Sequence, residues 1–153
     1  MLFEPRASDL DLDEVEAALL RAAVGDYAAE AAVLLLSVHG HWLPQLREAG
    51  LVDLTLLEVD PGQGEQVLAG VDWSRVDGAL AAGRVSGDPA QRRVLRAAES
   101  LAEGRPVDLA DLTAGLERPD LALLLAAIAH AGGSHGDPTG GAVPALVAWP
   151  QRG

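Results

Sequence analysis

Two stretches of this 153-residue chain are apolar on almost every side, and they constrain its fold more than any other feature. Residues 27–38 read YAAEAAVLLLSV and residues 120–131 read DLALLLAAIAHA. A helix that is apolar all round belongs in a protein interior. Each stretch is about a dozen residues long, whereas a membrane span needs roughly 20. We therefore expect two buried helices at the centre of one soluble core.

The composition favours the same architecture. The chain holds 28 Ala and 26 Leu, which are strong helix formers, but only five aromatic residues. It has no cysteine, which excludes disulfides and thiolate metal sites. The predicted fold class is mainly α: a compact helical bundle of six to seven helices with one short β-hairpin inserted at about 51–71.

Local signals predict where several helices begin and end. Asp11 with Glu14, and Asp88 with Gln91, have the spacing of capping boxes, in which each side chain satisfies the other's backbone N–H. Asp108 is a third capping residue. These signals predict helices starting near 12, over 89–103 and near 109, and further helices are predicted over 42–49 and 73–82.

The pattern changes at residue 51. LVDLTLLEVD alternates apolar and polar residues, which is typical of a strand. PGQG follows as a turn, and EQVLAGV is interpreted as the returning strand.

Composition also divides the chain. We predict a single helical domain over 1–131, followed by a Gly/Pro-rich linker and an apolar tail over 132–153 that contains Trp149. The tail either folds back onto the domain or docks on another molecule. We expect it to fold back, because apolar patches are usually covered.

Charge limits the possible partners. The net charge is −12, which repels nucleic acid and favours basic partners. Residues 1–30 hold eight acids and two Arg, a net of −6, whereas residues 84–105 hold five Arg and three acids, a net of +2. We expect a protein partner or a homo-oligomer, with no nucleic acid and no membrane. The N-terminus does not have the pattern of a secretory signal, so a cytoplasmic location is expected.

The candidate partner-binding residues come from both charged regions and from the tail. An arginine cluster can grip a phosphate or an acidic peptide. The alternative is a solvated helix face on which Glu99 and Glu103 are the intrahelical partners. The candidates are Asp9, Asp11, Asp13, Glu16, Arg92, Arg93, Arg96 and Trp149.

Four histidines are the candidate metal ligands: His39, His41, His130 and His135. On a continuous helix His39 and His41 point to nearly opposite sides, although Gly40 between them can end the helix and free their directions. His39 and His130 each fall in the last turn of a predicted helix, where the helix dipole favours a basic group. We therefore predict no metal, catalytic or cofactor site, and keep a small metal-dependent enzyme as an alternative.

Residues 91–133 resemble the three-helix core of helix-turn-helix regulators, with VL in the first helix, an ADL-containing short second helix, and a third helix ending in Ala-Gly. The resemblance implies DNA binding through the third helix, whose exposed positions should carry Arg, Ser, Thr or Asn. Here the third helix reads LALLLAAIA. A degenerate helix-turn-helix regulator over 89–131 is therefore a second alternative.

The leading interpretation is that the protein is a non-enzymatic, acidic module for protein–protein interaction, or an accessory module. It is expected to bind no cofactor, and self-association is one form that its interaction can take.

Overall fold

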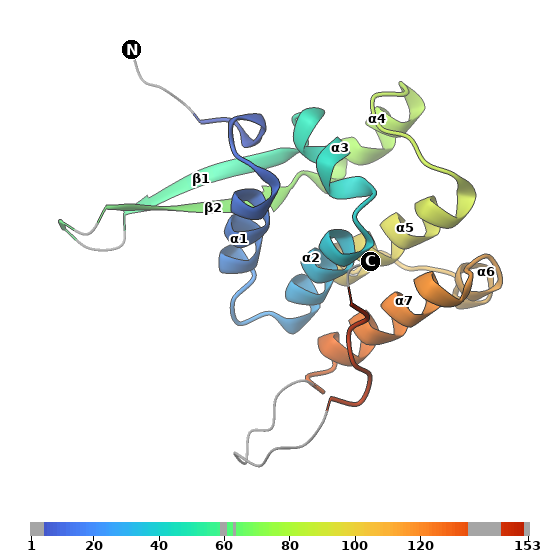
Figure 1. Ribbon diagram of the computed structural model, residues 1–153. Coiled ribbons are helices and arrows are strands. Elements are labelled where there is room, and N and C mark those ends of the chain that lie inside the picture. The colour runs from blue at the N-terminus through green and yellow to red at the C-terminus, as the bar shows by residue number, and fades with distance from the viewer. Residues whose placement is uncertain (1–4, 59–60, 63, 135–144, 152–153) are drawn as a thin grey trace. The chain divides into compact units, whose positions relative to one another are not determined.

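The computed structural model describes residues 5–58, 61–62, 64–134 and 145–151. Within these ranges it shows a mainly helical fold with seven α-helices, two short 3-10 turns and one antiparallel hairpin, which confirms the predicted fold class (Figure 1). The elements are, in order, η1 (Ala7–Asp9), α1 (Leu12–Ala22), α2 (Tyr27–His39), α3 (Trp42–Glu48), β1 (Val52–Glu58), β2 (Glu65–Val71), η2 (Trp73–Arg75), α4 (Val76–Ala81), α5 (Pro89–Glu103), α6 (Leu109–Ala114) and α7 (Arg118–Ala131).

The chain forms two compact units, each built from two separate stretches. The first comprises Met1–Val24 and Leu43–Ser86, and the second comprises Gly25–Trp42 and Gly87–Gly153. The prediction of one domain over 1–131 with a following linker and tail stays a prediction, and residues 135–144 of that linker lie outside the described residues.

In the first unit, α1 packs on β2 of the hairpin. The Asp11–Glu14 capping box is present and starts α1 as predicted. The strands pair in register from Val52 opposite Val71 to Glu58 opposite Glu65, so the predicted hairpin is confirmed. Near α3 the sheet is buried at Val52 and Ala69, and the Nε–H of Arg21 donates to the Val67 carbonyl at 3.1 Å, which ties α1 to β2.

In the second unit, α2 packs against both α5 and α7. Each of these three helices buries a pair of adjacent alanines, and such small side chains allow helices to approach closely. The pairs are Ala31 and Ala32, Ala97 and Ala98, and Ala126 and Ala127. The larger core side chains around them include Leu35, Leu36, Val94, Leu95 and Leu124.

The two apolar stretches do pack on each other, but only α2 fits the expectation of a deeply buried helix. On α7, Leu123 and Leu124 are buried, whereas Leu125 and Ile128 are each 48% exposed. The prediction that both helices are buried all round is therefore wrong for α7. Other elements cover only part of its circumference, since the second unit supplies α2 and, to a lesser extent, α5.

Candidate functional site

The second unit contains an open groove of about 400 Å³, which we call the arginine groove. It lies between the first half of α5 and the chain around the start of α6. Its lining consists of Pro89, Arg92, Arg93, Arg96, Pro106, Val107, Asp108, Asp111 and Leu112. The three candidate arginines therefore meet in one place, alongside apolar side chains and two carboxylates.

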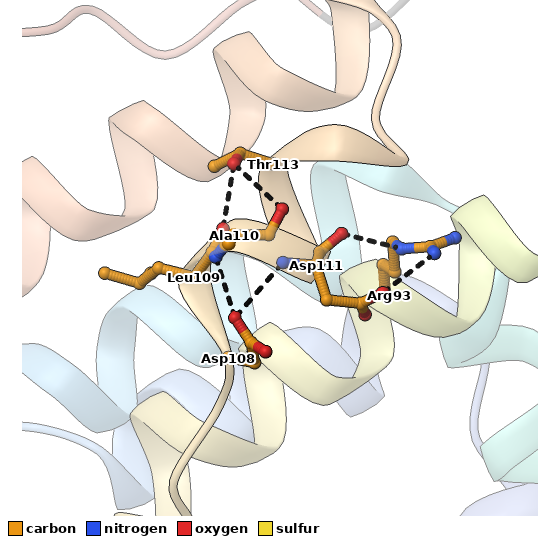
Figure 2. Close-up of polar contacts among 6 residues, drawn as sticks. All are labelled: Arg93, Asp108, Leu109, Ala110, Asp111 and Thr113. Carbon is orange, nitrogen blue, oxygen red and sulfur yellow. Dashed lines mark hydrogen bonds and ion pairs between the residues drawn. The ribbon is translucent and has the colours of Figure 1, made fainter.

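The short helix α6 forms one wall and is held by local hydrogen bonds. Asp108 caps it, because its Oδ1 accepts from the backbone N–H of Ala110 at 2.9 Å and of Asp111 at 3.2 Å. The Thr113 hydroxyl donates to the carbonyl of Leu109 at 2.8 Å (Figure 2). The Asp108 carboxylate is thus engaged in capping α6, as the sequence predicted.

Arg93 joins the two walls of the groove. Its Nε–H donates to the Asp111 carbonyl at 3.1 Å, and its Nη2 lies 3.3 Å from the Asp111 carboxylate (Figure 2). A Cβ atom at Gly115 would overlap the Arg93 guanidinium, so the missing side chain there makes room for this contact. Arg93 is therefore a structural link between α5 and α6 and not a solvated residue.

Arg92 and Arg96 are four residues apart and so lie on one side of α5. The Nε–H of Arg92, which is exposed, donates to the Gly87 carbonyl at 3.0 Å. Arg96 pairs with Glu99 at 3.2 Å and keeps 42% of its side chain exposed. These two guanidiniums are the accessible cations of the groove.

Glu99 departs from its predicted role as a solvated partner. Its side chain is only 4% exposed, with Arg96 at 3.2 Å and Arg105 at 3.8 Å from Oε1. Its second oxygen, Oε2, has no hydrogen-bond partner among the described residues. An intrahelical arginine partner for Glu99 was predicted, and Arg96 is that partner, but the burial of Glu99 depends on how α5 packs in the unit.

The described histidines do not all gather at one point. The rings of His39 and His41 lie close together, with centroids 6.3 Å apart, but His130 has separate partners. His39 Nε2 lies 3.6 Å from Asp120, and His130 Nε2 lies 2.6 Å from Glu30. Glu30 and His39 are nine residues apart on α2, which is roughly 13 Å along a helix. Across the described ranges there is no group of three or more His, Asp or Glu side chains able to hold a metal ion. His135 lies outside the described residues.

Instead, two histidine–carboxylate pairs join α2 to α7. Each helix has an acid in its first turn, Glu30 or Asp120, and a histidine in its last turn, His39 or His130. Because the helices run antiparallel, the acid of one meets the histidine of the other at both ends. From the sequence, each histidine was explained by the helix dipole alone, and these partners were missed. The available signal was that both apolar helices have an acid in the first turn and a histidine in the last turn.

The side chain of His39 is as buried as that of His130. Its side chain is 8% exposed and its Nδ1 has no hydrogen-bond partner among the described residues. Burial lowers the pKa of His39 below its ordinary value of 6.5, and although the Asp120 carboxylate opposes this shift, the neighbouring His41 adds to it. His41 itself stacks edge-on against Trp42, with ring centroids 4.8 Å apart.

Trp149 lies against the other histidine. Its indole Nε1–H points to His130 Nδ1 at 3.3 Å, and the ring centroids are 5.9 Å apart. Within the second unit, the described part of the tail thus contacts α7, as expected for a tail that folds back.

The acidic candidates for partner binding belong to the first unit, and two of them accept hydrogen bonds from the backbone. Asp9 accepts from the backbone N–H of Arg6 at 3.1 Å, and Asp11 caps α1. Asp13 is exposed and Glu16 is half-buried.

The helix-turn-helix resemblance can be followed in α6 and α7, which are separated by three residues. Along its middle the exposed positions of α7 carry Leu125 and Ile128, and its one exposed arginine, Arg118, is the first residue of the helix.

No helix within the described residues combines the length and apolar character that crossing a membrane requires. The chain matches no protein-family model, no curated protein and no solved structure.

Proposed function

We propose that this protein is a non-enzymatic interaction module whose arginine groove binds an acidic, partly apolar segment of a protein partner. The observation that carries the proposal is the meeting of Arg92 and Arg96 with an apolar lining in an open groove of about 400 Å³.

The side chains of the groove have the chemistry of a protein interface. Arginine is enriched at such interfaces, and its planar guanidinium binds carboxylates through two parallel hydrogen bonds. Pro106 and Val107 supply apolar surface, and Val107 is 36% exposed. An extended peptide directs alternate side chains to opposite sides, so a segment that alternates acidic and apolar residues can satisfy both kinds of lining.

The groove's own carboxylates are engaged in holding the fold. Asp108 caps α6, and Asp111 pairs with Arg93. Their involvement in structure supports a binding role over acid–base chemistry. The groove is also open to solvent, which suits a chain segment better than a small ligand, because small-ligand pockets enclose most of their ligand's surface.

The net charge of −12 opposes an acidic partner at long range. At about 0.15 M salt, however, exposed charges more than roughly 8 Å apart are largely screened. Recognition is then decided by the charges that line the groove, and two of these are accessible arginines.

The test is fluorescence anisotropy with a short labelled peptide of alternating Asp and Leu, titrated with the full chain. We expect saturable binding that weakens about ten-fold or more when Arg92 and Arg96 are both changed to Gln, because two charge-assisted contacts are lost. Arg93 is left intact, since its loss would disturb α6. Gln is chosen at position 96 because its amide can still donate a hydrogen bond to the buried Glu99.

Arg118→Gln is the matched control, because Arg118 is an exposed arginine of the same unit that does not line the groove. A peptide with Asn in place of Asp should not bind. Equal binding by the double variant and by the wild type, or no saturable binding to the wild type, would contradict the proposal.

A further inference from the structure

The contacts of His130 form a directional chain from the tail to α2. The indole Nε1–H of Trp149 lies 3.3 Å from His130 Nδ1, and His130 Nε2 lies 2.6 Å from Glu30 Oε1. The His130 side chain is 8% exposed, so water has little access to it.

The hydrogen positions follow from the chemistry of the two neighbours. An indole nitrogen is a donor only, so Nδ1 must accept and cannot carry a proton. The remaining proton of the neutral imidazole is then on Nε2, from which it is donated to the Glu30 carboxylate. The two contacts thus assign the Nε2–H tautomer to neutral His130.

We propose that residues 145–151 form a strap that Trp149 fastens to neutral His130 and that acid releases by protonating this histidine. Protonation adds a hydrogen to Nδ1 and turns the acceptor of the indole hydrogen bond into a second donor. The docked strap and the imidazolium therefore exclude each other, and each lowers the equilibrium affinity for the other.

Glu30 acts on His130 in the opposite sense to Trp149, because its carboxylate stabilises the imidazolium. The Glu30–His130 contact therefore persists as an ion pair after release. Acid is therefore expected to detach the strap while leaving α2 and α7 joined.

Other ionisable groups on the packed elements have separate roles. On α2, His39 pairs with Asp120 at the opposite end of the helix pair, and Tyr27 lies beside Gly133. On α5, buried Glu99 pairs with arginines of its own region. The described strap, residues 145–151, contains no acidic or basic side chain.

Within the strap, Val147, Trp149 and Pro150 are half-buried, whereas Leu146 is 81% exposed. The indole hydrogen bond to His130 adds a directional contact to this partial burial. Its loss weakens the docked state, so a change of one proton can shift the docked population.

The experiment follows the indole and imidazole nitrogens by ¹⁵N NMR in the full chain between about pH 7.5 and about pH 5. The Trp149 indole signal is assigned with Trp149→Phe. At the upper pH we expect His130 as the Nε2–H tautomer and a protected Trp149 indole. On acidification that indole should move to a solvent-like position as His130 titrates, and its exchange, corrected for intrinsic rates, should rise on the order of ten-fold.

Two variants test the direction in which the pH of strap release moves. Glu30→Gln removes the group that favours the imidazolium, so the release should move to lower pH. His39→Gln alters the equivalent pair at the other end of the same helices and should leave the Trp149 titration unchanged. Any of three results would overturn the proposal. The Trp149 indole signal could be solvent-like already at about pH 7.5, or it could stay unchanged while His130 becomes protonated. In Glu30→Gln, the midpoint of strap release could move to higher pH instead of lower pH.

Discussion

At the scale of single residues, two glycines show how a missing side chain can determine local packing. A Cβ atom at Gly87 would lie 2.7 Å from Trp42 Cζ2 and 3.1 Å from His41 Nε2. The Trp42 indole cannot easily move away from such an atom, because it is fully buried and its Nε1–H donates to the Gln91 carbonyl at 2.7 Å. At Gly78, in contrast, an added Cβ meets nothing within 4 Å.

We therefore expect Gly87→Ala to lower the free energy of unfolding by about 1–3 kcal/mol, as overpacking of a fixed core side chain does. Gly78→Ala, in helix α4, should be neutral or stabilise by up to about 1 kcal/mol, because alanine favours the helix. Urea unfolding followed by circular dichroism measures both. A Gly87→Ala variant as stable as its Gly78→Ala counterpart would show that Trp42 is not confined as described.

At the scale of elements, the features that could be predicted from the sequence are those whose cause lies within a few residues. Capping by Asp11, Asp88 and Asp108 depends on backbone N–H groups two or three positions away, and all three caps are present. The hairpin followed from the alternation in 51–58 and the turn residues after it, and its register matches that alternation.

The features that sequence reasoning missed depend on contacts between distant segments. The pairing of Glu30 with His130 joins residues 100 positions apart and exists only because α2 and α7 pack antiparallel. Arg93 was expected on a solvated face, but it bonds to Asp111 because Gly115 leaves space for it. The arginine groove itself needs α6 to lie beside α5, and a cluster of arginines in the sequence could not establish that.

The His39–Asp120 pair between α2 and α7 carries a pH prediction. Because burial lowers the pKa of His39 in the folded state, the unfolded chain binds the proton more readily. The contribution of His39 to stability is therefore present above its unfolded pKa of 6.5 and is lost as the pH falls toward the lower folded pKa. The slope for one proton is at most about 1.4 kcal/mol per pH unit.

Urea unfolding at about pH 7.5 and about pH 5.5 checks this, because this window includes the ordinary titration range of histidine. The wild type should lose more stability over this interval than His39→Gln, in which the titrating group is absent. The prediction fails if the variant loses as much stability as the wild type.

At the scale of the whole molecule, the charge distribution and the groove suggest how an acidic protein can recognise an acidic segment. Overall charge governs solubility and long-range encounter, whereas side chains in contact with the partner set specificity. Under the proposed function, those side chains are the ones that line the arginine groove, from α5 and from the chain that enters α6. His39 and His130 lie apart, at the two ends of the α2–α7 pair, and neither lines the groove.

The most direct test of this account is to map where the acidic peptide binds, using ¹H–¹⁵N correlation spectra of the full chain with increasing peptide. Binding in the arginine groove should shift signals mainly from residues 89–96 and 106–112, while signals from the hairpin and from α2 stay in place. Shifts centred elsewhere, or a spectrum that does not change at saturating peptide, would contradict it.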